Sequence, residues 1–380
     1  MSFVLSQEQR LLKQTAGDFV KSRSSLKRIR TLRDSADATG FSRDIWREMA
    51  ELGWVGMLLP EDDGGSALGY MDLMMVMEEL GRGLMPEPML STTLLGANAV
   101  LLGGSEAQRR ELLPAIARGE LLVALAYQEP SGRFDPHTVQ TTAEPSGRGW
   151  KLRGEKCLVL DGHVADRILV SARTSGSIAD RHGVTLFLID PREHGVLVNR
   201  QMLVDSRIVA SIRLSDVAVD ESAIVGEPEN GGNLLEAILD RATAGLCAEM
   251  LGAMSAAFEM TLEYLKTRKQ FGVAIGTFQA LKHRAAILYT EIELARSAVM
   301  GMNQALDEAR PGASALVSVA KVSCSDAFLL AANEGVQMHG GIGMTDEHDI
   351  GFFLKRARAA EMTFGDAAWH RRRYAELEGY

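Results

Sequence analysis

Hydrophobic residues recur at helical spacing through about the first 120 positions. Leu12, Ala16 and Val20 fall on one stripe, and Ser6 with Gln9 three residues later has the spacing of a capping box. Further helices are expected near 45–52, 70–80 and 106–117, with glycine and proline between them. The pattern predicts a helical N-terminal domain over residues 1–119.

Near residue 120 the spacing changes to short β-type runs separated by Gly, Pro, Asp and Ser. These runs are 122–126, 157–160, 167–171, 184–189 and 208–214. Because no helical segment lies between them, they favour an antiparallel barrel or sandwich over a doubly wound sheet. We expect a β-domain over residues 120–228.

After Gly231-Gly232 the helical spacing returns and persists. One apolar seam runs over 246–264 and a second over 281–302, both in steps of three and four residues. A third helix is expected over about 313–336 and a shorter one from Asp366. These segments predict a C-terminal four-helix bundle over 229–380, and the whole chain is expected to be of the α+β class.

The composition narrows the class of protein. The chain has 380 residues, of which 46% are hydrophobic and 24% charged, as in a soluble protein of two or three domains. Its longest apolar run, 121–127, is shorter than the roughly 20 residues that cross a bilayer. The net charge of −9 argues against nucleic acid as a partner. We expect a cytoplasmic chain without membrane insertion.

Metal and thiol chemistry are not indicated. Cys157, Cys247 and Cys324 are far apart and form no CxxC pair, so we expect reduced core residues. The eight histidines form no HExxH or paired-ligand spacing, and neither a GxSxG elbow nor a P-loop is present.

A cationic and aromatic turn follows the first bundle helix, with the sequence Arg268-Lys269-Gln270-Phe271-Gly272. The fork of an arginine suits a pyrophosphate group. The same residues also suit an ordinary helix end, because basic side chains complement the helix dipole and Gly272 would stop the helix. Spacing alone favours the helix end.

A glycine-rich segment follows the third bundle helix, with the sequence Gln337-Met338-His339-Gly340-Gly341-Ile342-Gly343. Glycines allow a ligand to approach the backbone closely. The segment lacks the preceding strand and following helix of a dinucleotide fingerprint, so a Rossmann site is excluded. A loop that only turns the chain is the equal alternative.

Taken together, the chain resembles the acyl-CoA dehydrogenase family over essentially its whole length. The segments that carry the resemblance are 6–9 (SQEQ), 59–65 (LPEDDGG), 128–130 (QEP), 154–156 (GEK), 268–272 (RKQFG), 278–279 (FQ) and 337–343 (QMHGGIG). The resemblance implies the three-domain fold described above, FAD as cofactor, an acyl-CoA as substrate and an electron acceptor such as an electron-transfer flavoprotein.

The resemblance also implies the site residues. Arg268 would hold the FAD pyrophosphate of a neighbouring subunit, with Gln270, Phe271 and Gln279 beside it. The adenosine end would be held by Gln337, Gly340 and Gly341, and the isoalloxazine ring flanked by Gln128, Leu158 and Leu160. Because such a site is shared between subunits, a dimer or a dimer of dimers is implied, either homo- or heteromeric.

The chain departs from the family at the catalytic base. The family reaction removes the α-proton of the thioester with a glutamate while hydride leaves the β-carbon for the flavin. The aligned stretch is Phe364-Gly365-Asp366-Ala367, with Gly365 at the base position, and the base position of other branches is Ala242. Of the two nearby carboxylates, Asp240 is two residues from Ala242, about 200° of helical rotation, and should point away from the site. Asp366 is the better candidate, because the permissive backbone of Gly365 can re-aim it. Its alternative role is the N-cap of the last helix.

Three functions therefore remain open. The first is an FAD-dependent acyl-CoA dehydrogenase for an unusual or bulky acyl chain, with Asp366 or another carboxylate as base. The second is a non-catalytic partner subunit of a heteromeric dehydrogenase, similar to the small subunits that lack the usual glutamate, supplying Arg268 to the neighbour's FAD. The third is a flavin monooxygenase on the same fold, whose chemistry needs no α-proton base.

Overall fold

The computed structural model describes residues 4–132 and 134–380. The chain forms two compact units. The bundle unit contains residues up to 35 together with 69–85 and 243–380, and the sheet unit contains 36–68 and 86–242. Each unit therefore draws on separate stretches of the sequence.

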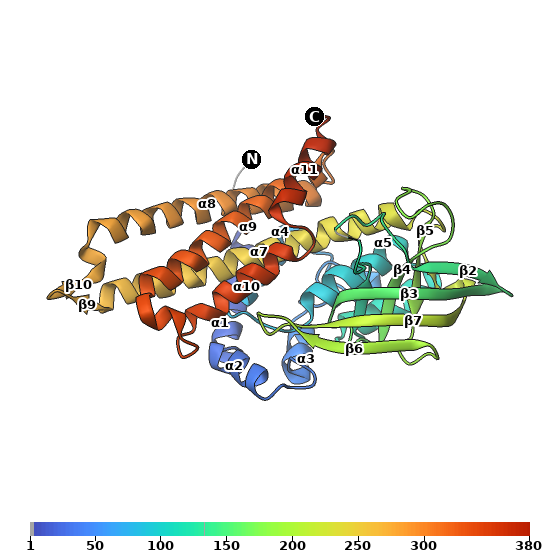
Figure 1. Cartoon of the computed structure of the whole chain (residues 1–380), viewed down its shortest axis with the longest axis horizontal. Helices are drawn as coiled ribbons and strands as arrows, with labels where there is room; N and C mark the ends of the chain where they lie inside the picture. Colours follow the sequence, from blue (N-terminus) through green and yellow to red (C-terminus); the bar gives the residue numbers. More distant parts are fainter. Residues whose placement is uncertain (1–3, 133) are drawn as a thin grey trace. The chain divides into compact units, whose positions relative to one another are not determined.

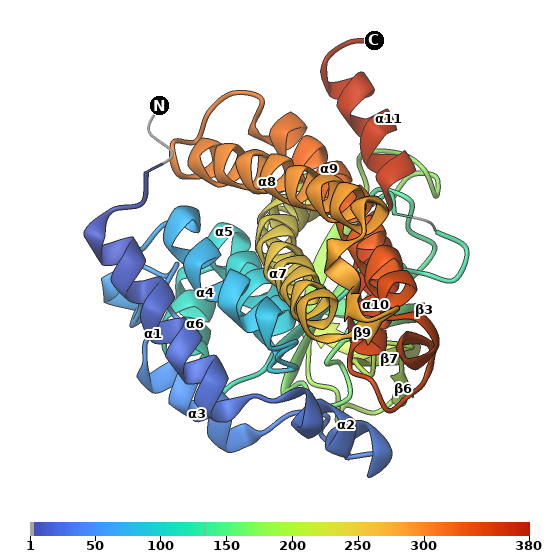
Figure 2. The same cartoon turned by 90° about the vertical axis from the view of Figure 1, so that its left-hand side faces the viewer.

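In the bundle unit, the part of α7 (Gly231–Thr267) from residue 243 onward runs beside the long helices α8 (Gln279–Asp307) and α9 (Ala313–His339) (Figure 1, Figure 2). Helix α9 packs against α8, α10 (Ile350–Met362) and α11 (Ala367–Leu377). The remaining helices of this unit are α1 (Gln7–Arg23), α2 (Leu26–Asp34) and α4 (Tyr70–Arg82). The bundle is thus built around α9.

The start of α1 confirms the predicted capping box. The Ser6 hydroxyl accepts from the Gln9 N–H at 3.1 Å, and the Gln9 side-chain oxygen accepts from the Ser6 N–H at 3.1 Å. Helices α2 and α10 were not predicted. Four of the nine residues of α2 are basic, and the apolar residues of α10 form a short run, so neither segment shows a clear apolar stripe.

Helix α9 with the turn after it, Ala313–Met344, is long and apolar enough to cross a membrane by length and composition alone. Most of its apolar window, 61%, is buried inside the chain. The buried face is covered by α8, α10 and α11. A central bundle helix is expected to have this composition, because it is surrounded by other helices.

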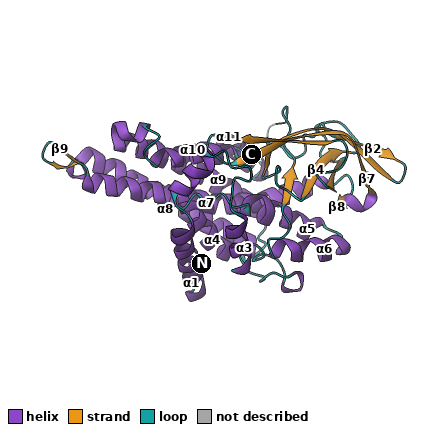
Figure 3. Cartoon of the chain, turned by 90° about the horizontal axis from the view of Figure 1, so that it is seen from below, coloured by secondary structure: helices purple, strands orange, loops and turns teal. Residues whose placement is uncertain are grey.

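The sheet unit holds an eight-stranded sheet in the order β6-β7-β3-β2-β4-β5-β8, with β1 paired to β4 (Figure 3). The strands are β1 (Val123–Ala126), β2 (Thr142–Ser146), β3 (Gly149–Leu160), β4 (Arg167–Arg173), β5 (Val184–Ile189), β6 (Val196–Met202), β7 (Ile208–Asp220) and β8 (Ile224–Val225). Most pairs are antiparallel, but β4 pairs in parallel with both β1 and β2. The expectation of a purely antiparallel domain is corrected on this point.

The core of the sheet unit is formed by inward-facing aliphatic and aromatic residues, among them Leu152, Ile168, Phe187 and Ile212. The same unit contains α3 (Arg43–Glu51), α5 (Asn98–Gly103), α6 (Glu106–Ala117), the π-helical segment η2 (Met89–Ala97) and the short 3-10 turns η1 (Glu61–Asp63) and η3 (Glu221–Ala223). Segment η2 packs on β1, and all nine of its residues are buried.

Candidate functional site

The predicted pyrophosphate segment forms a hairpin at the end of α7 (Figure 1). Strand β9 (Lys269–Gln270) pairs with β10 (Val273–Ala274), and the two turn residues, Phe271 and Gly272, have φ of 53° and 81°. Two consecutive positive φ angles are typical of a type I′ hairpin turn. The helix ends at Thr267, so Gly272 turns the hairpin and does not stop the helix. The C-cap interpretation of Gly272 was wrong.

The residues predicted to contact FAD are exposed on this hairpin and at the start of α8. Arg268, Gln270, Phe271 and Gln279 all face solvent, and Phe271 is 92% exposed. The Phe271 ring lies edge-on to Phe278, with 6.2 Å between centroids. Within the described residues Arg268 has no ion-pair partner. These side chains make few contacts within the chain, and they expose a cation and an aromatic ring to solvent.

The predicted adenosine segment forms the end of α9 and the 3-10 turn η5 (Gly340–Met344). Gln337, Gly340 and Gly341 are exposed. A Cβ atom on either glycine would meet no atom within 4 Å. Packing inside the chain requires neither glycine, although the φ of 66° at Gly340, which caps α9, favours glycine at that position. The backbone of both residues is open to close approach by a ligand.

Ring contacts bring these two segments to the same end of the bundle unit. Tyr264, in the last turn of α7, lies 4.5 Å from the ring of His339 at the end of α9, and His339 lies 4.4 Å from His348. The Nδ1 atom of His339 is 2.6 Å from the Gly335 carbonyl oxygen, and burial lowers the pKa of His339. The hairpin and the glycine turn directly follow these packed residues along the chain.

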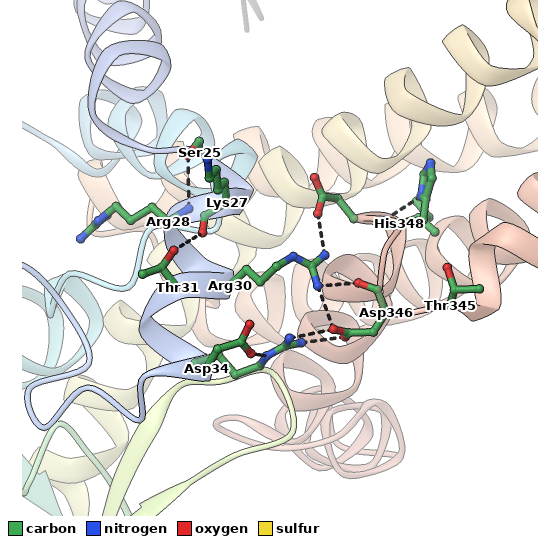
Figure 4. Close-up of polar contacts among 12 residues, drawn as sticks. Ser25, Lys27, Arg28, Arg30, Thr31, Asp34, Thr345, Asp346 and His348 are labelled. Carbon is green, nitrogen blue, oxygen red and sulfur yellow. Dashed lines mark hydrogen bonds and ion pairs between the residues drawn. The ribbon is translucent and has the colours of Figure 1, made fainter.

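Helix α2 anchors the connection that follows the glycine turn (Figure 4). The Arg33 guanidinium donates to both carboxylate oxygens of Asp346 at 2.7 Å, and Arg30 donates to Asp346 at 2.8 Å and to Asp349 at 2.9 Å. The hydrogen bonds from Arg33 lower the pKa of Asp346 to about 2. Both arginines also lie over the Phe352 ring. Two guanidinium groups therefore fix the loop between η5 and α10.

In the sheet unit, two of the family-like segments are joined by a buried ion pair. The Lys156 Nζ lies 2.7 Å from a Glu129 oxygen and 2.9 Å from the Ser171 hydroxyl. Glu129 also accepts from the N–H groups of Gln140 and Thr141. Burial lowers the pKa of Lys156 to about 8, against the opposing effect of Glu129. The glutamate of QEP and the lysine of GEK thus join two segments of the sheet unit.

The residues predicted to flank the isoalloxazine ring lie next to this ion pair. The Gln128 carbonyl accepts from the Cys157 N–H at 2.9 Å, which places Gln128 beside the strand that carries Leu158 and Leu160. Leu158 has φ of 53° and lies where the register of β3 on β7 shifts, between Lys156 and Val159. This bulge leaves Leu158 46% exposed.

Asp161, directly after β3, is a titratable residue that the sequence reasoning missed. The Ser91 hydroxyl donates to its carboxylate at 2.5 Å. Burial raises the pKa of Asp161 to about 6. Its φ of 52° is a second left-handed conformation near the end of this strand. A lone Asp-Gly pair after a strand usually indicates only a turn, so the sequence offered little signal.

The turn at the family's base position is tightly packed in the bundle unit. Gly365 has φ of +114°, and a Cβ atom there would lie 2.6 Å from Trp369 Cε3 and 3.0 Å from His370 Nε2. The Asp366 Oδ1 accepts from the Trp369 N–H at 2.7 Å, so Asp366 caps α11. This confirms the cap, and the role of Asp366 as base stays a prediction.

Two further side chains at this turn were missed by sequence reasoning. Lys321 on α9 and His370 on α11 are both buried and hydrogen-bond to carbonyl groups of the turn. A signal existed for Lys321, because it is a single cation in the small and apolar run 315–324. No comparable pattern marks His370.

Comparison with known proteins identifies the class. Family models for the N-terminal, middle and C-terminal domains of acyl-CoA dehydrogenases match residues 6–120, 124–217 and 229–377. The chain therefore belongs to the acyl-CoA dehydrogenase family, whose members are oxidoreductases that bind FAD. The fold prediction is confirmed at this level.

Individual relatives cover nearly the whole chain. It is 29% identical to the probable acyl-CoA dehydrogenase YngJ of Bacillus subtilis over 96% of both proteins. Butyryl-CoA dehydrogenase from Megasphaera elsdenii has a TM-score of 0.91 at 25% identity, covering 100% of both chains. A variant of the Tcur3481-Tcur3483 steroid ACAD has a TM-score of 0.87 at 30% identity, covering 98% of both.

Proposed function

We propose that the chain is an FAD-dependent acyl-CoA dehydrogenase that catalyses the α,β-dehydrogenation of an acyl-CoA thioester, with a bulky or unusual acyl chain. The observation that carries the proposal is the pair of exposed segments at one end of the bundle unit, the Arg268 hairpin and the Gly340-Gly341 turn. Both keep residue types that suit a dinucleotide, and packing within the chain requires neither Arg268 nor Gly341.

The residues present fit FAD. The exposed guanidinium of Arg268 would bind the pyrophosphate, because its donors match two phosphate oxygens at once. Gln337 with the open backbone of Gly340 and Gly341 would bind the adenosine end. Gln128, Leu158 and Leu160 of the sheet unit would contact the isoalloxazine ring. When bound, FAD supplies the hydride acceptor.

Asp366 would act as the base that takes the α-proton. The cap hydrogen bond from Trp369 fixes the carboxylate through Oδ1. No hydrogen bond to Oδ2 is present within residues 4–132 and 134–380, so this oxygen would accept the proton. A thioester α-proton is weakly acidic, so the base must be held close and in a fixed orientation.

The test is anaerobic mixing of the flavin-loaded protein with a panel of acyl-CoAs, followed by flavin absorbance. Asp366→Asn is the informative variant, because asparagine is also a good N-cap and only the proton acceptor is removed. We expect bleaching in the wild type and a loss on the order of 1000-fold in the variant. Asp326→Asn, an exposed carboxylate of α9, is the control. Bleaching that is equally fast in Asp366→Asn would exclude Asp366 as the base.

A second candidate function is favoured by Gly365. Because the turn leaves no room for a side chain at this position, the chain would serve as the partner subunit of a heteromeric dehydrogenase whose base lies in the other subunit. The similarity to the Tcur3481-Tcur3483 steroid ACAD supports this candidate. A stable homo-oligomer that bleaches with acyl-CoA in the absence of any second chain would argue against it.

Exposed apolar side chains on α8 support assembly in either case. Ile287 and Leu294 lie seven residues apart, on the same face of the helix, and each is more than half exposed. Exposed apolar side chains on one helix face commonly mark a subunit contact. We propose a dimer of dimers, with an electron-transfer flavoprotein as the electron acceptor. Sedimentation of the flavin-loaded protein tests the assembly, and a monomer at micromolar concentration would contradict it.

A further inference from the structure

Lys321 is a completely buried cation that lacks a carboxylate partner. It lies on α9, and its side chain is 0% exposed. Its Nζ donates to the Gly365 carbonyl at 2.7 Å and to the Glu361 carbonyl at 2.9 Å, with a longer contact of 3.4 Å to the Ser325 hydroxyl. No ion pair to Lys321 is found in the part of the chain that the structure describes. A buried ammonium group is normally paired with an anion, so this arrangement requires a reason.

The acceptors of Lys321 belong to the end of a helix. Helix α10 ends at Met362, so the Glu361 carbonyl is in its last turn. Gly365 lies three residues after Met362, just beyond the helix. The last carbonyls of a helix have no partner within the helix and carry partial negative charge. Lys321 therefore caps α10 from a neighbouring helix.

His370, on α11, binds the same turn from a second helix. Its Nε2 lies 3.2 Å from the Phe364 carbonyl oxygen, and its Nδ1 lies 3.2 Å from the Ser318 hydroxyl. Burial lowers the pKa of His370 to about 3, so the ring is neutral at pH 7. Nε2–H then donates to the carbonyl, and Nδ1 accepts from Ser318. Side chains of α9 and α11 thus bind three carbonyl groups of one five-residue turn.

We propose that Lys321 is a positioning residue that holds the turn 361–365, and through it Asp366, in place for proton abstraction. The turn ends one residue before Asp366, and the carbonyl that Lys321 binds belongs to the peptide unit that Asp366 continues. The inference rests on the proposed function, since it assigns a purpose to the geometry of Asp366. Lys321 itself does not touch the reacting atoms.

The charge of Lys321 is retained in spite of its burial. Burial lowers the pKa of Lys321 to about 8, so it remains an ammonium group at neutral pH. The ionisable groups that face it are Cys247 on α7, Cys324 on α9, Glu361 on α10, and Asp366 and His370 at α11. An ammonium group binds the partially negative carbonyl oxygens at the end of a helix more strongly than a neutral donor does, so removing the charge should loosen the turn.

The first experiment measures the turn without using activity. Amide hydrogen exchange of the peptide spanning 359–371 is followed in the full chain for the wild type and for Lys321→Met. We expect exchange about tenfold faster in the variant, because two buried carbonyl groups lose their donor. Lys282→Met, which removes an exposed lysine from α8 of the same unit, is the control and should leave this peptide unchanged. Unchanged exchange in Lys321→Met would overturn the proposal.

The second experiment distinguishes positioning from mere stability. Anaerobic flavin reduction is measured for Lys321→Gln, which keeps a donor without charge, and for Lys321→Arg, which keeps both. We expect kcat to fall by about 10- to 100-fold in Lys321→Gln with little change in KM. Lys321→Arg should recover most of the wild-type kcat. An unchanged kcat in Lys321→Gln would overturn the positioning role.

The two experiments separate this proposal from the proposed function. A wild-type chain that never bleaches, combined with the expected exchange difference, would reject the dehydrogenase and retain the role of Lys321 in holding the turn. A wild type that bleaches normally, with no exchange difference in Lys321→Met and no change of kcat in Lys321→Gln, would reject the role of Lys321 and retain the dehydrogenase. Lys321→Gln also replaces Lys321→Met in the exchange experiment if the methionine variant does not fold.

Discussion

The segments proposed to bind FAD and the turn proposed to carry the base belong to the same bundle unit, yet they are built in opposite ways. Arg268 is exposed, and a Cβ at Gly341 would touch nothing. Gly365 is buried with no space for a Cβ, and Asp366 is already engaged as a helix cap. A polar or glycine residue that makes few contacts within the chain suggests ligand binding. A residue that packing or helix capping already requires has a structural explanation, which must be considered before a catalytic role.

The largest expected effect comes from restoring a glutamate at the base position. Gly365→Glu forces a side chain onto a backbone with φ of +114° and into contact with Trp369. Strain and overpacking together should lower the free energy of unfolding by about 3 kcal/mol or more. We expect no gain in flavin reduction by acyl-CoA. Chemical denaturation and anaerobic absorbance measure the two quantities.

Gly341→Ala is the control for Gly365→Glu. Its new Cβ meets open space, so the free energy of unfolding should change by less than about 0.5 kcal/mol. Retention of FAD should nevertheless weaken if the backbone there approaches the cofactor. If Gly365→Glu is as stable as the wild type and its flavin is reduced faster, then the base turn is not as tightly packed as proposed, and it does not differ from the exposed segments in this respect.

The second effect concerns the pH dependence of stability at the base turn. Burial lowers the pKa of His370 to about 3, whereas an unfolded histidine has a pKa near 6.5. As the pH falls below about 6.5, the unfolded state binds a proton that the folded state refuses, so folding is penalised progressively until about pH 3. Between pH 7 and pH 5 this residue should cost about 2 kcal/mol of unfolding free energy.

The measurement is urea denaturation at pH 7 and pH 5 for the wild type and His370→Gln. The variant should lose less stability over this interval, although it starts from a lower value because the ring is buried. His283→Gln, a change at an exposed histidine, should leave the wild-type difference unaltered. Identical pH slopes in the wild type and His370→Gln would show that the folded chain does not lower the pKa of His370.

Periodicity predicted the parts of the molecule in which one local rule decides the structure. The long apolar seams became α7 and α8, and the Ser6 capping box starts α1 as expected. The parallel pairing of β1 with β4 was missed, because strand partners are chosen by tertiary packing and leave no mark on the alternation within a strand.

At the candidate site, the type of a residue was not enough to predict its role, because the role depends on the surrounding structure. Gly272 was interpreted as a helix stop, although β9 separates it from the helix and it forms the hairpin turn. Lys321 was overlooked, because its acceptors are backbone carbonyls some 40 positions later, which no side-chain pattern encodes. Helix α10 lies between Lys321 and Gly365 in the sequence. Because this helix was not predicted, the turn that follows it could not be predicted either.

The smallest effect on stability, and the sharpest test of the exposed region, is at Arg268. Arg268→Ala removes an exposed side chain, so the midpoint of thermal unfolding of the FAD-free protein should stay within about 1–2 °C of the wild type. FAD affinity should fall by about tenfold or more, since charge-assisted hydrogen bonds to a phosphate are lost. Arg268→Lys keeps the positive charge but lacks the forked guanidinium group, so its FAD affinity should lie between those of the wild type and Arg268→Ala. Lys269→Ala, a change at the neighbouring exposed cation, controls for net charge. If Lys269→Ala weakens FAD as much as Arg268→Ala, the hairpin attracts the cofactor by general charge, and the arginine fork is not the recognising group.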